Sequence, residues 1–234
     1  MKHFCTFGST PGYNAALARI KKQALDSGYF DTVHIYDQTN TPGIDAHREF
    51  IDTHTRGYGY WIWKPLIILD IMKKVASGDT IIYADAGCYI NSTPGSREIF
   101  AKYLVALDAP PYRLGFYFPS LKESVWCKGD LLDYFGLRGG SHASSGQFMG
   151  GIQILKNTPD NQALMEEWLS VMTRDGYRFV DDSPSISPNE AGFREHRHDQ
   201  SVISLLMKIR GTTYCSQPTH DSKSPIAIMR SRNR

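Results

Sequence analysis

The fold of this 234-residue chain is decided by the stretch Asp79-Thr-Ile-Ile-Tyr-Ala-Asp-Ala-Gly87. Its centre, residues 80–84, is apolar and rich in β-branched and aromatic side chains, and glycines flank it, so the pattern predicts a buried strand. Asp85 stands where that strand should end, and Gly87 lets the backbone turn sharply or approach a ligand closely.

The position of Asp85 suggests a ligand site. Ligands of open α/β sheets bind beyond the carboxyl ends of the strands, which is where Asp85 is expected. A carboxylate there can hold a hard cation, and the cation can hold a diphosphate. The alternative interpretation is that Asp85 only caps the next turn.

The segments before this stretch predict alternating strands and helices. A strand over residues 3–8 is followed by a helix that Asn14 caps and Gly28 ends, and then by a strand over residues 32–36. This rhythm implies a parallel sheet covered by helices. We therefore expect an α/β fold, a Rossmann-like single domain with a mostly parallel central sheet flanked by helices.

The second half of the chain adds further strands and a long loop. Residues 147–155 are expected to form one strand entered through Gly150 and Gly151, because paired glycines mark a bulge or a close backbone approach. Residues 212–215 are expected to form a last strand. The loop over residues 177–197 is long, and such loops in compact domains are usually functional or disordered.

Composition excludes several classes of protein. Hydrophobic residues are 41% and charged residues 21%, as in an ordinary globular domain, and the net charge of +2 argues against a general nucleic-acid binder. No apolar run reaches the roughly 20 residues of a transmembrane helix, and the N-terminus lacks the apolar segment of a signal peptide. The four cysteines are scattered, so we expect a reducing, cytoplasmic location rather than a disulfide framework or a zinc site.

A second unusual stretch is Arg56-Gly-Tyr-Gly-Tyr-Trp-Ile-Trp-Lys-Pro65. Pro65 suits the first turn of a helix. Arg56 and Lys64 stand beside aromatic residues that we expect to be exposed, and beside a helix N-terminus, where an anion is favoured. For Trp61 and Trp63, the alternative is simple packing between helix and sheet.

A third candidate is Asp199-Gln200, at the start of a helix with apolar residues at positions 202, 205, 206 and 209. That apolar face should hold the first turn rigidly against the core, as a catalytic group requires. The alternative is that Asp199 is only a favourable charge in the first turn of a helix. The adjacent His198 and the long polar loop before it favour a site.

These landmarks resemble, in their order along the chain, the GT-A class of nucleotide-sugar glycosyltransferases. The resemblance rests on Thr6-Phe7-Gly8, on Ala84-Asp85-Ala86-Gly87, on the strand with Gly150-Gly151, and on Asp199-Gln200. The run from Arg56 to Pro65 resembles small cytosolic enzymes that build capsular, lipopolysaccharide-type or viral glycans. The resemblance implies one glycosyltransferase domain over residues 1–234, with a donor-nucleotide half at about 1–110 and an acceptor half at about 111–234.

The resemblance also implies an activity and a set of site residues. The expected enzyme moves a hexose from a UDP-sugar donor to a glycan acceptor with the help of Mn²⁺ or Mg²⁺, and its catalytic residues are Asp199 and Gln200. The donor-binding residues would be Thr6, Phe7, Gly8, Arg56, Trp63, Lys64, Asp85, Ala86, Gly87, Gly150 and Gly151. The acceptor-binding residues would be Trp126, Lys128 and His198, and the metal ligands Asp85 and His220. Gly87 occupies the position of the second acid in the Asp-x-Asp metal motif, so one carboxylate ligand is missing.

Two other functions remain open. A hydrolase could use Asp85, Asp199 and a metal ion to cleave a phosphoester or a nucleotide sugar. A degenerate transferase could serve as a non-catalytic glycan-binding module, since the second acid is absent. Nearby aromatic residues such as Tyr58 and Trp126 would suit stacking against a sugar.

Overall fold

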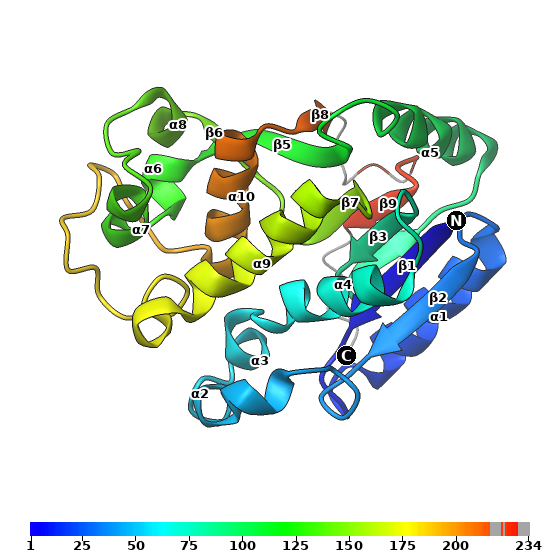
Figure 1. Cartoon of the computed structure of the whole chain (residues 1–234), viewed down its shortest axis with the longest axis horizontal. Coiled ribbons are helices and arrows are strands. Elements are labelled where there is room, and N and C mark those ends of the chain that lie inside the picture. The colour runs from blue at the N-terminus through cyan, green and yellow to red at the C-terminus, as the bar shows by residue number, and fades with distance from the viewer. Residues whose placement is uncertain (216–220, 222, 229–234) are drawn as a thin grey trace.

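The computed structural model describes residues 1–215, 221 and 223–228, and within them the predicted α/β fold is confirmed (Figure 1). A seven-stranded sheet has the order β2-β1-β3-β7-β5-β6, and β8 pairs with β5. The strands are β1 Lys2–Phe7, β2 Thr32–Tyr36, β3 Thr80–Ala84, β4 Cys88–Ile90, β5 Arg113–Lys122, β6 Gly146–Phe148, β7 Ile152–Lys156, β8 Thr213–Cys215 and β9 Ile226–Ile228. The α-helices are α1 Asn14–Ser27, α2 Arg48–Thr53, α3 Gly57–Tyr60, α4 Trp63–Lys74, α5 Pro94–Ala106, α6 Glu123–Trp126, α7 Gly129–Tyr134, α8 Ser141–Ser144, α9 Pro159–Thr173 and α10 His198–Arg210, and the 3-10 helices are η1 Ile44–His47 and η2 Arg174–Tyr177.

The first half of the sheet is parallel, as the sequence predicts. β1 pairs in parallel with β2 and with β3, with Phe4 opposite Val33 on one side and Ile82 on the other. Gly28 ends α1 in the left-handed conformation, with φ 69°, which glycine adopts without a steric penalty. The predicted capping role of Asn14 is wrong, because Asn14 is the first helical residue.

In the second half of the sheet β7 is antiparallel to both β3 and β5, and one predicted strand is corrected. The predicted single strand over residues 147–155 is divided into β6 and β7, because the chain leaves the sheet at Gly150 and Gly151. β6 pairs with β5, whereas β7 runs antiparallel to β3, with Ile152 opposite Ala84. This register brings the start of β7 to the end of β3, so the paired glycines lie beside Asp85.

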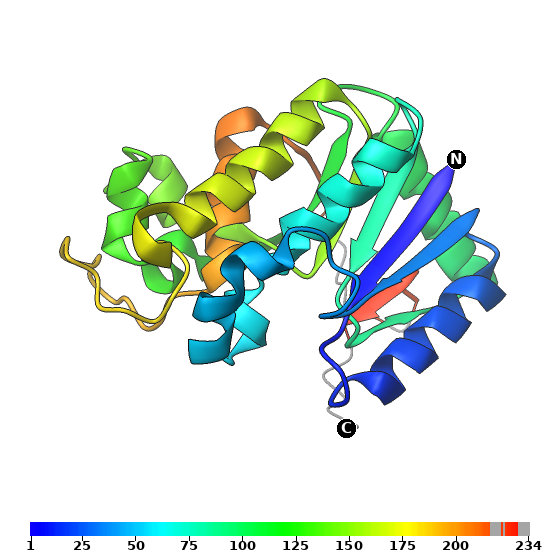
Figure 2. The same ribbon diagram turned by 60° about the horizontal axis from the view of Figure 1, so that its bottom comes forward.

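Two layers of helices cover the sheet. On one face α4 and α9 lie side by side, and their apolar residues join those of α10 in one core that includes Ile68, Trp168 and Val202 (Figure 2). On the other face α1 and α5 enclose a second core, which includes Ile20 and Phe100. The site described below lies where α4 and α10 begin, because both helices are anchored by the first core.

The end of the described chain returns to the sheet. Residues 213–215 form β8, parallel to β5 as the last strand of the large sheet, but a further strand, β9, follows and pairs with β4. The segment over residues 139–146, which is rich in glycine and serine, contains the short helix α8. Among the residues that the structure describes, no helix combines the length and the apolar character needed to cross a bilayer.

Candidate active site

A buried ammonium group lies at the centre of the site. Lys64 is in the first turn of α4, and its side chain is only 3% exposed. Its Nζ lies 2.7 Å from Asp199 Oδ2 and 3.2 Å from Asp85 Oδ1, and it donates a longer hydrogen bond of 3.4 Å to the Gly150 carbonyl. The expectation that Lys64 precedes the helix beside exposed aromatics is wrong, because the residue is inside the helix and buried.

Asp85 is fixed at the end of β3 by its own backbone and by a neighbouring phenol. Its N–H donates to the Gly151 carbonyl at 2.9 Å, and the Tyr83 hydroxyl donates a very short hydrogen bond to Asp85 Oδ1. The Asp85 side chain is still 40% exposed, so it is the most accessible member of the cluster. Strand periodicity could have identified Tyr83, because residues two apart in a strand lie on the same face.

The paired glycines make room for both carboxylates. A Cβ on Gly151 would lie 2.6 Å from Asp85 Oδ2, and a Cβ on Gly150 would lie 3.0 Å from Asp199 Oδ2. Any side chain at Gly151 would therefore displace the Asp85 carboxylate. The predicted close approach of the backbone is observed, and its partners are the two acids themselves.

Asp199 is the buried acid of the site. It lies in the first turn of α10, its side chain is 5% exposed, and its backbone carbonyl accepts a hydrogen bond of 3.1 Å from Trp168 Nε1. Burial raises the pKa of Asp199 to about 6, although the Lys64 ammonium opposes that shift. Burial by itself lowers the pKa of Lys64, but Asp199 and Asp85 together raise it above its ordinary value. At neutral pH the Asp199 carboxylate and the Lys64 ammonium therefore face each other as ions.

A chain of side-chain amides orients Gln200, next to Asp199. Gln200 Nε2 donates to Gln147 Oε1 at 2.7 Å, and Gln147 Nε2 donates to Glu123 Oε2 at 2.8 Å. Gln200 Oε1 is then free to accept from the Gly150 N–H at 3.3 Å. Because a carboxylate only accepts hydrogen bonds, Glu123 determines the direction of every amide in the chain.

Glu123 is itself held in place by a buried lysine. The carboxylate is completely buried, and it lies 2.6 Å from Lys208 Nζ and 2.5 Å from the Ser204 hydroxyl, which donates to it. Sequence reasoning missed Glu123, Gln147 and Lys208. Charged residues are rarely fully buried without a partner, but a sequence does not show which of them are buried.

The expected donor-binding residues Thr6, Phe7 and Gly8 lie at the carboxyl end of β1. Phe7 stacks on Trp63 with 4.0 Å between the ring centroids, and Trp63 Nε1 donates to the Gly57 carbonyl at 3.0 Å. Thr6 is buried, and its hydroxyl has no hydrogen-bond partner among the described residues. The expected exposure of the aromatic run is wrong for Trp63, which is part of the core, and its role toward a donor stays a prediction.

The turn after Asp85 contains Gly87, at the position of the second acid of the Asp-x-Asp motif. The Ala86 carbonyl accepts a hydrogen bond of 2.7 Å from Arg19 Nη2, which fixes the turn. Gly87 is exposed, and a Cβ built on it would meet no atom within 4 Å. The roles of Ala86 and Gly87 in donor binding stay predictions.

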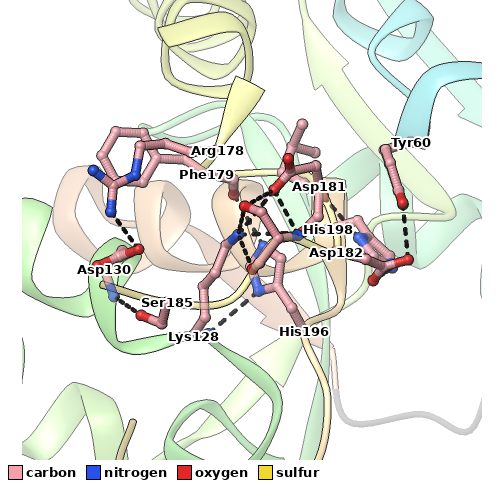
Figure 3. A network of polar contacts seen from close by, with 12 residues as sticks. Tyr60, Lys128, Asp130, Arg178, Phe179, Asp181, Asp182, Ser185, His196 and His198 are labelled. Carbon is pink, nitrogen blue, oxygen red and sulfur yellow. Dashed lines mark hydrogen bonds and ion pairs between the residues drawn. The ribbon is translucent and has the colours of Figure 1, made fainter. Parts of the chain in front are cut away.

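The loop over residues 178–197 is tied to the expected acceptor region by buried polar contacts (Figure 3). Lys128 is buried, and its Nζ lies 3.0 Å from Asp181 Oδ1 and donates to Ser183. Asp130, from the same segment, accepts backbone hydrogen bonds of 2.9 and 2.8 Å from the loop. The Lys128 ammonium is thus engaged in holding the loop, and its contact with an acceptor stays a prediction.

The remaining expected residues meet the loop on its other side. Trp126 is half-buried under the Arg197 guanidinium, 4.2 Å from its ring centroid. Arg56 Nη1 lies 3.1 Å from Asp182 Oδ2, and His198 faces the same carboxylate. The structure therefore joins Lys64, Asp85, Gly150, Gly151, Asp199 and Gln200 by direct contacts, and it places Arg56 and His198 around Asp182.

The described residues do not make a metal site by themselves. No group of three or more histidine, cysteine or acidic side chains that could hold an ion occurs among them. One Asp85 oxygen, Oδ1, is already bound by Lys64 and Tyr83, and the position of the second motif acid is Gly87. His220, the other predicted ligand, lies outside the described residues.

Comparisons with known proteins agree with this fold. No protein-family model and no curated protein matches the chain. An active-site mutant of LgtC matches 91% of this chain and 72% of its own, with 10% identity and a TM-score of 0.52. Mouse xyloside xylosyltransferase 1 matches 93% of this chain and 85% of its own, with 13% identity and a TM-score of 0.47. The glycosyltransferase GlyE of Streptococcus pneumoniae has 12% identity and a TM-score of 0.47 over 93% of this chain, which spans only 45% of GlyE. The chain has the GT-A fold of the glycosyltransferases, over more than 90% of its length.

Proposed function

We propose that this protein is a glycosyltransferase that moves a hexose from a UDP-sugar donor to a glycan acceptor. The observation that carries the proposal is the pair of carboxylates on the Lys64 ammonium, placed at the carboxyl end of β3 in a GT-A fold. The donor would lie across the ends of β1 and β3, where Asp85 is half-exposed, because ligands of such sheets bind beyond the strand ends.

The charge of the cluster suits the transition state of glycosyl transfer. Lys64, Asp85 and Asp199 sum to one net negative charge when all three are ionised. Positive charge grows on the sugar ring in the transition state, and a preorganised negative group near the anomeric carbon stabilises it. Lys64 thus acts chiefly by holding the two acids in place, rather than by binding the diphosphate as the sequence suggested.

Gln200 and Asp199 would take different parts in the reaction. Asp199 is buried and rigid, which suits a group that stabilises the reacting sugar. Gln200 has one amide N–H left after its bonds to Gln147 and Gly150, and that N–H can donate to a sugar hydroxyl. The acceptor hydroxyl must also be positioned and lose a proton, as in any such transfer.

The proposal includes binding of Mn²⁺ or Mg²⁺, with Asp85 as the ligand that the described residues supply. Asp85 Oδ2 is the oxygen that a divalent ion could reach, and the remaining ligands would have to come from the nucleotide, from water or from residues outside the described part. The missing second acid argues for weak binding, since hard ions gain affinity from the number of carboxylates.

Thermal melting with nucleotides tests the proposal. A ligand present at 100 times its Kd stabilises a protein by about 2.7 kcal/mol, which for a chain of this length raises Tm by about 5–10 °C. We expect such a shift with UDP and UDP-hexoses, with and without Mn²⁺, and none with ADP or GDP. Equal shifts with all three nucleotides, or no shift with any, would contradict a UDP-sugar transferase.

Asp85→Ala provides the matched kinetic test. Release of UDP from UDP-hexoses should be lost in this variant while the fold, followed by circular dichroism, stays intact. A variant that keeps activity within a few-fold of wild type would remove Asp85 from the site. If the wild-type protein releases UDP at a rate that no glycan acceptor increases, the hydrolase alternative is favoured instead.

A further inference from the structure

A second polar cluster adjoins the proposed active site, between the aromatic run and the loop over residues 178–197 (Figure 3). Asp182, from the loop, accepts a hydrogen bond of 2.9 Å from the Tyr60 hydroxyl and one of 3.1 Å from Arg56 Nη1. His198 Nε2 lies 3.6 Å from Asp182 Oδ1. About half of the Asp182 and Arg56 side-chain surface is exposed, so the cluster is accessible from solvent.

His198 has an unsatisfied ring nitrogen that points at Asp182. Its Nδ1 lies 2.7 Å from the Val180 carbonyl, which can only accept, so Nδ1 carries the hydrogen. Burial lowers the pKa of His198 below its ordinary value, which keeps the ring neutral at pH 7. Nε2 is therefore an acceptor; it is fully buried, and it has no hydrogen-bond partner among the residues that the structure describes.

Two acceptors thus face each other without a hydrogen between them. A carboxylate and a neutral imidazole nitrogen gain nothing from this contact, and a buried acceptor left without a donor costs about 1–3 kcal/mol. The separation of 3.6 Å allows one oxygen at about 2.8 Å from both atoms, provided that the exposed Asp182 side chain moves to open the buried Nε2. The cluster therefore calls for a ligand that brings hydroxyl donors.

Backbone strain is concentrated at the same place. His198 has φ 50°, and Tyr60 and Trp61 have φ 51° and 64°, which are uncommon for residues with bulky side chains. The three rings lie together, with the His198 centroid 4.7 Å from that of Tyr60 and 5.6 Å from that of Trp61. Strain of this kind persists where the surroundings enforce it, and it is common at ligand sites.

We propose that Asp182, His198 and Arg56 form a subsite that binds two neighbouring hydroxyls of the acceptor glycan. One hydroxyl donates to His198 Nε2 and the other to Asp182, while the Arg56 guanidinium donates to their oxygens. The subsite rests on the proposed transferase function, and it adjoins the reacting centre because Asp199 follows His198 directly in α10. The exposed sides of Asp182 and Arg56 let the rest of a glycan extend into solvent.

Asp182→Asn tests the subsite with little change in shape. An asparagine can donate its own N–H to His198 Nε2, and so removes the need for a ligand donor. Saturation-transfer NMR on the full chain with saturating UDP would measure binding of methyl glycosides of galactose, glucose, mannose and xylose. We expect at least one to bind wild type, and its affinity to fall at least tenfold in Asp182→Asn.

Asp45→Asn is the matched control, because Asp45 also pairs with an arginine, Arg48 at 2.8 Å, but lies elsewhere on the surface. It should bind the same glycoside as wild type does. Nitrogen-15 shifts of the His198 ring give a second measurement. The glycoside should shift the Nε2 resonance in wild type and leave Nδ1 protonated.

The outcomes separate this proposal from the proposed function. If no glycoside binds, or if Asp182→Asn binds it as wild type does, the subsite is wrong even when UDP still binds. If Asp182→Asn instead weakens UDP-hexoses relative to UDP and leaves the glycosides unaffected, the hydroxyls belong to the donor and the acceptor assignment is overturned. If UDP itself does not bind wild type, the proposed function is wrong, and the subsite proposal that rests on it is overturned as well.

Discussion

Lys64 and Asp199 form an ion pair of 2.7 Å in which neither side chain is more than 5% exposed. The pair joins the first turns of α4 and α10, which are distant in sequence, at the edge of the sheet where Asp85 ends β3. Lys64 precedes a proline at a helix start, where a lysine is normally solvated, but here it is buried. We therefore expect mutations of this ion pair to affect stability strongly.

Lys64→Met should therefore destabilise the protein strongly. Removing one partner of a buried ion pair leaves an uncompensated charge and costs about 3–5 kcal/mol. The control is Lys74→Met in the same helix, because Lys74 is 60% exposed, so solvent screens its pair with Asp70. That variant should lose no more than about 1 kcal/mol. Urea denaturation of both variants compares them, and equal losses would mean that the Lys64 pair is energetically like a surface pair.

Gly151→Ala should impair the site with the fold intact. A methyl group at this position would lie 2.6 Å from Asp85 Oδ2 and push the carboxylate away from Lys64. We expect the rate of UDP release to fall at least tenfold. Gly95→Ala is the control, because its Cβ would meet no atom within 4 Å, and it should keep full activity. Wild-type rates in Gly151→Ala would show that the position of Asp85 is not critical.

Asp199→Asn should change how stability depends on pH. The folded carboxyl has a pKa of about 6 against an ordinary value of 3.8, so it binds its proton at a higher pH than the unfolded chain does. Protonation of Asp199 thus adds stability that is fully present below about pH 4 and is lost as the pH rises through about 6. The whole change amounts to about 3 kcal/mol.

The measurement is the free energy of unfolding of wild type minus that of Asp199→Asn, from urea melts between pH 4 and 8 with a chelator present. The difference should decrease as the pH rises. A difference that is constant with pH would mean that Asp199 titrates normally. Turnover at pH 7.5 should meanwhile fall much more than donor affinity, because an interaction made mainly in the transition state is lost.

Lys208→Met should destabilise the protein through Glu123. The carboxylate would lose its counter-ion in a fully buried position, at a cost of about 3–5 kcal/mol. The double variant Glu123→Gln with Lys208→Met removes both charges and should recover most of the loss, because replacing both partners of a buried pair is often nearly neutral. A double variant as unstable as Lys208→Met would show that packing, rather than charge, causes the loss.

The fold and the principal acids could be predicted from local patterns. Strands β2 and β3 have the predicted bounds, and Gly28 ends α1 as predicted. Asp85 and Asp199 could be singled out because each stands at the end of a strand or the start of a helix. Such signals depend on a few neighbouring residues, so the sequence contains them.

The rest of the site depends on contacts between distant segments. Glu123, Gln147 and Asp182 have no local pattern that marks them, and each meets its partners only when the fold brings distant segments together. The burial of Lys64 was also missed, because a lysine next to a proline in a helix start is normally solvated. The division of residues 147–155 into two strands follows from pairing with different neighbours, which periodicity does not reveal.

β7 lies between β3 and β5 in the sheet although it follows both of them in the chain, so β5 joins the parallel strands only once β7 has been made. During synthesis the parallel strands β1 to β3 can pair first, since amino-terminal segments fold earlier. Lys64 then lacks Asp199 until α10 has left the ribosome. A stalled nascent chain that ends before residue 198 should therefore react at Lys64 with amine-modifying reagents, whereas the finished protein excludes them. Completion of the ion pair would thus mark a late stage of folding, followed by the pairing of β8 and β9.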